Sequence, residues 1–557
     1  MHSRDAAHML DRYALLLEIA GENPFKARAF AAAAEMLAQH DQSLHDLIES
    51  GSLHHVRGIG EGILAVLEEL DRTGTISHLA ALEQQIPPGV IQLTELRGVG
   101  PKKARQLWLD YGITSIEQLE RACQEQRVAT WKGFSAKTQA ALLEAIAFWR
   151  STRGRIQRHK AWRYVRALQE VLQQHGAMQV FAAGPLRRGA EVIEEIVLVA
   201  VVLNPSTFQP PEGFQAAGSF RYRHLTADVP ITLIVSEPES AGTALFFATG
   251  SEEFIAAAVA SMPVPPLPRE EDVFAALELP FIPPELRNDA AIVQQVRAGA
   301  SLPSLITLGD MRGMIHVHTT WSDGQNTIEE MALHARQLGF EYIVICDHSQ
   351  SAAYAGGLTV ERVLQQKAEI EALNKRLQGI TILHGIESDI LPDGSLDYPD
   401  EVLIHFDVVV ASVHTHFNLS RHEQTARILR AIANPYTTIL GHPTGRLLLR
   451  RSGYDVDLDA ILAEAARTGT VIEFNVNPYR LDLDWRHHRT ATAKGVRFAI
   501  DPDAHSIEGM AEITDGITVA RRGGLTAADV VNTLSLEQFR AFTTQLRHSK
   551  HHRVSAL

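Results

Sequence analysis

The feature that most restricts the fold is a regular alternation of apolar and amphipathic segments in the C-terminal half of the chain. From Met314 onward, short apolar runs alternate with stretches whose apolar residues recur at helical spacing. The apolar runs are Met314–His318, Tyr342–Asp347, Ile380–Glu387, Asp407–His414, Thr437–His442, Thr470–Asn475 and Val496–Asp503. The helical stretches include Thr327–Gly339, Val360–Leu377, Glu423–Ala433 and Leu458–Gly469. Strand-then-helix units in series predict a closed parallel barrel, one unit short of the usual eight.

Each apolar run ends in side chains that can bind a metal ion or a phosphate. His316 and His318 end the first run, for example, and Asp503 and His505 end the last. The carboxyl ends of barrel strands share one rim, so these dispersed residues are expected to meet in one pocket. A single histidine after a strand is more often a surface or capped core residue. Repetition at successive strands, interleaved with carboxylates, favours a metal site instead, and ligands without thiolate suit zinc, manganese or iron.

Composition limits where such a protein can work. A chain of 557 residues is expected to form three or four domains, and its two cysteines, Cys123 and Cys346, fit a reducing cytoplasm. Neither a signal sequence nor a membrane span is predicted. The net charge of −14 argues against an indiscriminate nucleic-acid binder. Residues 101–166 nevertheless carry fourteen Lys and Arg against five Asp and Glu, so a basic zone lies inside an acidic chain.

Two Gly-x-Gly sequences near the N-terminus precede predicted helices. The first holds Gly58 and Gly60, and the second holds Gly98 and Gly100, followed by Lys102 and Lys103. Glycine allows a tight turn, and the following helix N-terminus presents free N–H groups to a phosphate. One such sequence is usually an ordinary helix start. Two copies in phase resemble helix-hairpin-helix motifs that bind DNA, although Glu61 makes the first less suited to it, and a weaker third copy surrounds Gly133.

The C-terminal motifs resemble the polymerase-and-histidinol-phosphatase (PHP) family, a group of metal-dependent phosphoesterases. The resemblance implies three divalent ions, Zn²⁺, Mn²⁺ or Fe²⁺, which generate a hydroxide from bound water and polarise the phosphoryl group. It implies nine ligands: His316, His318, Asp323, His348, Glu387, His414, His442, Asp503 and His505. The neighbours Asp347, His416, Glu473 and Asp501 are predicted to orient ligand histidines. Arg446 and Arg480 are predicted to hold a substrate phosphate.

The N-terminal half resembles bacterial family X DNA polymerases. The resemblance rests on Asn23–Phe30, Gly184–Gly189, Thr249–Ser251 and Leu279–Arg287. It implies a multidomain chain in which helical hairpin domains precede an α+β nucleotidyltransferase-like palm and an α/β, distorted (β/α)7 PHP barrel. The predicted domains are 1–88 and 89–150 for the hairpins, 151–240 for the palm, 241–308 for a trimmed thumb and linker, and 311–550 for the PHP domain.

The predicted polymerase site departs from the family where its chemistry resides. Arg188 is kept in the phosphate-holding segment, but the three carboxylate positions align with Glu195, Val197 and Thr232. Two-metal nucleotidyl transfer needs those carboxylates, and valine cannot bind a metal. The amine required for sugar-phosphate lyase chemistry aligns with Val66. We therefore expect both activities to be weak or absent.

These patterns favour a DNA-binding metal-dependent phosphodiesterase, a 3′–5′ exonuclease that processes 3′ ends in DNA repair. Its expected partner is DNA that is gapped or carries a 3′ end, with no membrane, and the protein is expected to be a cytoplasmic monomer. Three alternatives stay open: a small-molecule phosphate monoesterase, a non-catalytic DNA-repair scaffold, and a still active gap-filling DNA polymerase.

Overall fold

The structure is a computed structural model that describes residues 1, 3–38, 42–55, 59–225, 228–260 and 262–555. The chain divides into two compact units, Met1–Arg153 and Gly154–Leu557. Among the described residues, no helix has the length and apolar character needed to cross a membrane. Because the cut follows Arg153, the helical hairpins fall in one unit, and the palm, thumb and barrel fall in the other.

The first unit is built from helices alone over its described residues. They are α1 (Ser3–Ala20), α2 (Pro24–Ala38), α3 (Leu44–Glu49), η1 (Ser52–His55), α4 (Glu61–Thr73), α5 (Ser77–Gln85), α6 (Pro88–Leu93), α7 (Pro101–Tyr111), α8 (Ile116–Gln124), η2 (Val128–Thr130) and α9 (Ala136–Thr152). Gly60 and Gly100 are the N-caps of α4 and α7, as the Gly-x-Gly pattern predicts. Gly58 lies outside the described residues.

The turns before α7 and α9 share one backbone feature. Gly98 and Gly133 have φ values of 84° and 87°, in the left-handed region where a side chain would be strained. Ser135 then caps α9 by accepting a hydrogen bond from the backbone N–H of Thr138. The helix pairs α6–α7 and α8–α9 are therefore two consecutive hairpins, and the third copy expected around Gly133 has the same turn as the second.

The second unit begins with the palm, which has two sheets. A two-stranded sheet joins β1 (Ile156–Gln157) and β3 (Val192–Ile193), and a five-stranded sheet has the order β2-β4-β7-β6-β5. Its strands are β2 (Gln179–Ala183), β4 (Ile196–Val201), β5 (Gln215–Ala216), β6 (Arg221–Leu225) and β7 (Pro230–Ser236), and the palm helices are α10 (Arg158–Gln174) and α11 (Gly184–Arg187). Strands β4 and β7 are parallel, and the other pairs are antiparallel.

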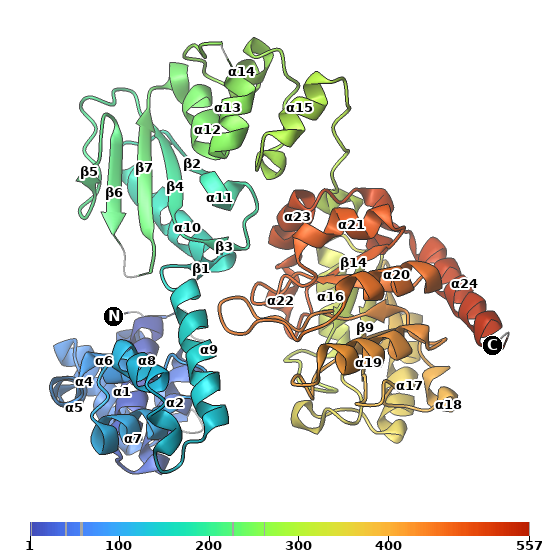
Figure 1. Cartoon of the computed structure of the whole chain (residues 1–557), viewed down its shortest axis with the longest axis horizontal. Helices are drawn as coiled ribbons and strands as arrows, with labels where there is room; N and C mark the ends of the chain where they lie inside the picture. The colour runs from blue at the N-terminus through green and yellow to red at the C-terminus, as the bar shows by residue number, and fades with distance from the viewer. Residues whose placement is uncertain (2, 39–41, 56–58, 226–227, 261, 556–557) are drawn as a thin grey trace. The chain divides into compact units, whose positions relative to one another are not determined.

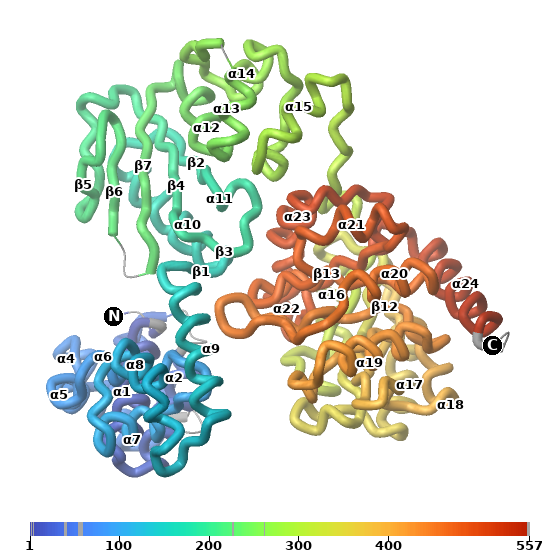
Figure 2. The backbone as a smooth tube through the Cα atoms, viewed as in Figure 1, coloured from blue at the N-terminus to red at the C-terminus, as the bar shows by residue number. Residues whose placement is uncertain are grey.

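A group of short helices connects the palm to the barrel. They are η3 (Pro238–Ser240), α12 (Ala241–Thr249), α13 (Glu252–Val259), α14 (Glu270–Ala276), η4 (Pro284–Leu286) and α15 (Ala291–Arg297). Glu270 on α14 is buried between Arg187 and Arg287, at 2.8 and 2.5 Å, and this ion-paired cluster ties the helices to the palm. The path of the chain through this region can be followed in Figure 2.

The C-terminal part is a nearly closed parallel barrel, which confirms the predicted alternation. Within residues 313–501, all of them described, seven strands follow the order β14-β13-β12-β11-β10-β9-β8. They are β8 (Gly313–Val317), β9 (Tyr342–Ile345), β10 (Thr381–Asp389), β11 (Val408–Ser412), β12 (Ile439–Leu440), β13 (Val471–Asn475) and β14 (Phe498–Asp501). A single parallel bridge between Val317 and Ala504 joins the first strand to the segment that follows the last.

Helices surround the barrel strands, and α19 and α20 lie in front of them in Figure 1. The barrel helices are α16 (Ile328–Gln337), α17 (Val360–Arg376), α18 (Asp400–Leu403), α19 (Arg421–Ala433), α20 (Leu458–Thr468), α21 (His488–Ala493), α22 (Ile507–Met510), α23 (Ile513–Arg522) and α24 (Leu536–Ser555). The short 3₁₀ turns are η5 (Leu308–Asp310), η6 (Ala353–Ala355), η7 (Trp485–His487), η8 (Ala527–Asp529) and η9 (Val531–Thr533).

Alternation along the strands decides which side chains enter the barrel. Val344, Leu383 and Val410 belong to an interior apolar layer, while their strand neighbours pack under the helices. On β10, Glu387 and Asp389 continue the interior face that starts at Leu383. The carboxylates therefore lie above the apolar layer, at the carboxyl end of the barrel.

Candidate metal centre

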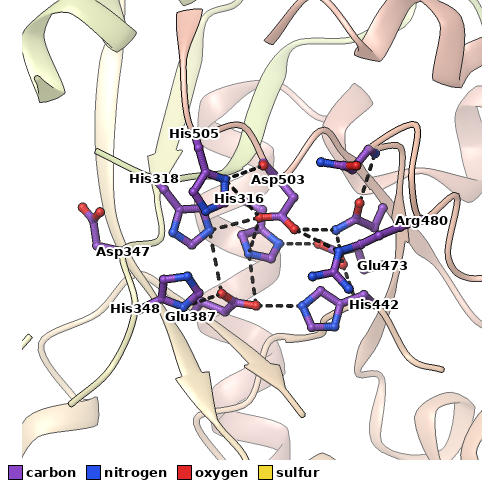
Figure 3. Close-up of polar contacts among 12 residues, drawn as sticks. His316, His318, Asp347, His348, Glu387, His442, Glu473, Arg480, Asp503 and His505 are labelled. Carbon is purple, nitrogen blue, oxygen red and sulfur yellow. Dashed lines mark hydrogen bonds and ion pairs between the residues drawn. The ribbon is translucent and has the colours of Figure 1, made fainter. Parts of the chain in front are cut away.

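The ends of the barrel strands bring all nine predicted ligands into one cluster. The histidines His316 and His318 lie at the end of β8. Asp503 and His505 lie in the segment after β14, which a single bridge joins to β8. Figure 3 shows most of these side chains converging from different strands. His316, His318, Glu387 and His442 are almost completely buried. Asp323 and His505 are partly exposed and form the open side of the cluster.

Glu387 is the central side chain of the cluster. Its Oε1 lies 3.4 Å from His316 Nε2, 3.3 Å from His414 Nε2 and 3.0 Å from His442 Nε2. Its Oε2 lies 2.9 Å from His348 Nδ1 and 3.7 Å from His318 Nε2. One carboxylate thus faces imidazoles from five different positions.

Two further carboxylates complete the cluster. Asp503 Oδ1 lies 3.2 Å from His318 Nε2 and 3.7 Å from His316 Nε2. Asp323 lies 3.3 Å from His505 Nε2 and 3.6 Å from His348 Nε2. Three of the four groups found among the described residues consist of predicted ligands, and the ligand atoms in each lie within 4.8 Å of one another: His316, His318 and Asp503; His348, Glu387 and His414; His318, Asp323, His348 and His505.

Unpaired buried atoms test whether these residues fit metal ions. Among the described residues, His316 Nε2, both ring nitrogens of His318, His348 Nδ1 and Glu387 Oε2 are buried without a hydrogen bond. Leaving buried polar atoms unsatisfied is costly, and a native protein rarely gathers several in one place. Cations would satisfy all of them, because the donor set is made of imidazoles and carboxylates only. The residues therefore fit divalent ions.

Electrostatics inside the cluster differ between its members: the neighbouring carboxylates raise the pKa of His348 and His414, whereas the pKa values of Glu387 and His318 are lowered. Burial opposes ionisation of Glu387, but the imidazoles of His414, His316 and His348 hold its pKa well below the usual range. Burial, with His505 and His348 nearby, lowers the pKa of His318 to about 3. His318 is therefore neutral at physiological pH, as a metal-binding imidazole must be.

The backbone is strained at three of the predicted ligands. His316, His442 and Asp503 have φ values of 56°, 22° and 51°, a region that side chains other than glycine rarely occupy. Such conformations persist only where the surrounding structure enforces them, and they concentrate at functional sites. At His316 the unusual angle interrupts the regular pairing of β8 with β9, where the register shifts between Met314 and Val317.

Two carboxylates accept hydrogen bonds from predicted ligand histidines and orient their rings. Glu473 accepts a hydrogen bond from His316 Nδ1, as the sequence predicts for an orienting residue. Asp389 accepts one from His414 Nδ1 at 2.7 Å. Sequence reasoning missed Asp389, although its position two residues after Glu387 on the same strand face was a usable signal. Asp501 lies close to His316 and Glu473, and burial raises its pKa well above the usual value.

Asp347 shapes a loop, and its hydrogen bonds to described residues do not include one to a predicted ligand imidazole. Its carboxylate accepts hydrogen bonds from the backbone and hydroxyl of Thr319 at 2.8 and 2.7 Å, and from Gln366 at 2.6 Å. It also accepts one from Ser322, next to the ligand Asp323. Figure 3 shows it apart from the cluster. Asp347 therefore holds the loop that carries Asp323.

Two of the predicted helper residues have other roles in the structure. His416 is exposed, and its ring contacts the hydroxyl of Thr415 at 3.1 Å rather than a ligand histidine. Arg446 is committed to the protein itself, because its guanidinium donates to the carbonyls of Arg480 and Leu481 and to Asp484. The predicted orienting role of His416 and the phosphate role of Arg446 are therefore corrected.

Arg480 is the arginine that reaches the cluster. Its Nε lies 3.5 Å from Asp503 Oδ2, and the side chain is one-fifth exposed. Asn475 donates to the same oxygen at 3.1 Å. Since the guanidinium has four further N–H donors, it can offer a bidentate pair to a phosphate beside the ligands.

The predicted polymerase positions in the palm lie together and include one carboxylate, that of Glu195. Val197 on β4 is paired with Thr232 on β7 in register, and the Thr232 hydroxyl donates to Glu195 at 2.6 Å. Arg188 donates to the carbonyl of Thr249 at 2.6 Å and is mostly buried. A single carboxylate that already accepts a hydrogen bond from a threonine provides too few ligands for two cations.

The second and third hairpins form a basic surface. Lys102 and Lys103 are exposed on the first turn of α7, and Lys103 Nζ donates to the carbonyl of Gly98 at 2.9 Å. A cavity of about 290 Å³ between the hairpins is lined by Arg97, Lys103 and Lys137. Three cations beside two helix N-termini suit a phosphate backbone.

Comparisons with known proteins agree with this arrangement. Residues 1–76 match a helix-hairpin-helix domain, residues 90–147 a SAM-like helix-hairpin-helix tandem, and residues 315–474 a PHP domain. A probable phosphatase of Thermoanaerobacter sp. (strain X514) is 29% identical over 229 residues, which are 39% of this chain and 89% of that protein. A probable phosphatase of Caldanaerobacter subterraneus subsp. tengcongensis is 27% identical over 243 residues, 42% and 91% of the two chains.

One relative spans the whole architecture. The Bacillus subtilis (strain 168) protein named DNA polymerase/3′-5′ exonuclease PolX is 35% identical over 573 residues. The similarity covers 97% of this chain and 99% of the relative, so it includes the hairpins, the palm and the barrel together. The chain therefore belongs to the family X DNA polymerases that carry a C-terminal PHP domain.

Proposed function

We propose that this chain is a metal-dependent phosphodiesterase that removes nucleotides from DNA 3′ ends, with its chemistry in the barrel. The observation that carries the proposal is Glu387, one carboxylate facing imidazoles from five positions, beside buried atoms that have no hydrogen bond to any described residue. The nine ligands have donors for three divalent ions, Zn²⁺, Mn²⁺ or Fe²⁺. Such ions supply a nucleophilic hydroxide at neutral pH and polarise the phosphoryl oxygens.

The side chains have separate tasks in this proposal. Glu473 and Asp389 hold His316 and His414 in their ring orientations. Arg480 binds a non-bridging oxygen of the scissile phosphate and sets its distance from the ligands. Lys102 and Lys103 hold the DNA backbone, which favours DNA over small phosphate esters as the substrate.

The palm is proposed to contribute no nucleotide transfer. Val197 and Thr232 replace two of the carboxylates required by the family's polymerase chemistry, and Glu195 is hydrogen-bonded to Thr232. The Bacillus subtilis relative is named as a DNA polymerase as well as an exonuclease. A primer-extension assay with all four dNTPs decides the point: template-dependent incorporation by this chain would refute it.

The test of the hydrolase uses labelled DNA with a recessed or gapped 3′ end and added Mn²⁺. We expect stepwise shortening from the 3′ end by the wild type, and loss of at least about 1,000-fold in Glu387→Ala and His316→Ala. Glu464→Gln is the matched control, because Glu464 lies on α20 and pairs with Arg467 away from the cluster.

A small-molecule phosphatase is the second candidate, and the similarity of the barrel to probable phosphatases favours it. Hydrolysis of phosphate monoesters without cleavage of DNA would support that function instead. DNA binding by the metal-loaded protein without any hydrolysis would support a scaffold.

A further inference from the structure

The loop that carries Arg480 is held on two sides. Residues 477–487, called here the Arg480 loop, connect β13 to α21. On the barrel side, Arg446 donates to the carbonyls of Arg480 and Leu481, and it pairs with Asp484 of the same loop. These contacts fix the backbone on which the Arg480 guanidinium approaches Asp503.

The other side of the loop is held by the palm. Trp485 Nε1 and Arg486 Nη1 each donate to the carboxylate of Glu191 at 2.7 Å. Arg486 Nη1 also lies 2.8 Å from Asp484 Oδ2, so the palm carboxylate is connected to Arg446 through two loop residues. Glu191 is buried and belongs to the palm segment that directly follows the Arg187-Arg188-Gly189 turn.

Two further palm residues contact the same part of the barrel. Gln157 is buried and donates to the carbonyl of Leu448 at 3.2 Å. Leu448 in turn donates its backbone N–H to the carbonyl of Tyr479, next to Arg480, at 2.6 Å. The ring of His159 packs edge-on against Tyr479 with centroids 4.9 Å apart.

We propose that the palm, having lost its metal-binding carboxylates, braces the metal centre, with Glu191 as the positioning residue for Arg480. The inference rests on the proposed function for its consequence in catalysis. A buried carboxylate with two donors is costly to remove, because Trp485 Nε1 then loses its partner and Arg486 Nη1 keeps only Asp484. A misplacement of Arg480 by a fraction of an ångström would move the phosphate that it binds.

The first test measures the loop itself and needs no activity. Hydrogen exchange of residues 477–487 is followed in the full-length wild type, Glu191→Ala and Glu194→Ala. Glu194 is a matched control, since it pairs with Arg155 at the palm surface at 2.6 Å. We expect exchange in the loop to rise about tenfold or more in Glu191→Ala and to stay unchanged in Glu194→Ala. Equal loop exchange in Glu191→Ala and the wild type would overturn the brace.

The second test asks whether Glu191 acts through Arg480. We expect Glu191→Ala to lower kcat/KM for DNA about 10- to 100-fold with unchanged bound metal, and to have no further effect in the Arg480→Ala background. Equal losses in both backgrounds would overturn the route through Arg480. Trp485→Phe removes one donor and keeps an aromatic ring, so it should give the same effects to a smaller degree, and it replaces Glu191→Ala if that variant folds poorly. A wild type that leaves DNA intact would refute the proposed function, and the exchange result would then decide the brace alone.

Discussion

Replacing Glu473 by glutamine tests how much the metal centre depends on residues behind its ligands. Glu473 Oε1 accepts from His316 Nδ1, while Oε2 accepts from the backbone N–H of His442 and, at 3.3 Å, from Asn475 Nδ2. Both oxygens therefore face donors. A glutamine must turn its NH₂ group toward one of them, which leaves a buried donor unsatisfied at a cost of about 1–3 kcal/mol.

That cost corresponds to a loss in metal affinity of about 10- to 100-fold, the same range as for other residues that orient metal ligands. The assay is a calorimetric titration of the metal-free protein with Mn²⁺. It compares the wild type, Glu473→Gln and the control Glu464→Gln. Glu464 is an ion-paired carboxylate on α20 of the same barrel. Affinity in Glu473→Gln within about twofold of the wild type would refute the reasoning, since the charge and both hydrogen bonds would then be dispensable.

Three more predictions concern other parts of the chain. Lys102→Ala with Lys103→Ala should weaken DNA binding and reduce the slope of log affinity against log salt by about 2, measured by fluorescence anisotropy; an unchanged slope would contradict phosphate contact there. Chelation with EDTA should abolish DNA hydrolysis and lower the melting temperature in a thermal scan, because several buried atoms of the cluster, Glu387 Oε2 among them, have no hydrogen bond within the described part of the chain. Burial, and secondly Asp515, raise the pKa of Glu512 to about 7, so the folded protein holds a proton that the unfolded chain releases. The melting temperature of the wild type should therefore fall relative to Glu512→Gln from about pH 5 to about pH 8, and parallel curves would contradict it.

The barrel could be predicted from sequence because its signals are local. Each strand is a short apolar run, and the ligands follow directly, so the parallel arrangement alone brings Glu387 to the same rim as His316 and Asp503. The change in the palm could also be predicted from the sequence, since a valine at position 197 cannot bind a metal in any fold. The predicted domain limits stay predictions, because the division into two compact units does not separate the predicted domains within each unit.

What could not be predicted depends on side-chain direction. Arg446 and Arg480 stand in similar loops with the same charge, yet Arg446 binds backbone carbonyls while Arg480 faces Asp503. His416 resembles His414 in sequence, but φ is 57° at His416 and its side chain is exposed. The contact between Glu191 and Trp485 joins residues far apart in the chain, and neither is part of a motif.

The bridge between Val317 and Ala504 implies that the metal centre also stabilises the barrel. Few hydrogen bonds hold the first strand to the end of the last: His318 N–H donates to Ala504 at 2.9 Å, and Ala504 N–H to His316 at 3.3 Å. Ligands stand on both sides of this joint, so ions bound there would fasten the two ends of the cylinder together. Loss of the ions would weaken this junction, and the first and last segments of the barrel would become mobile together.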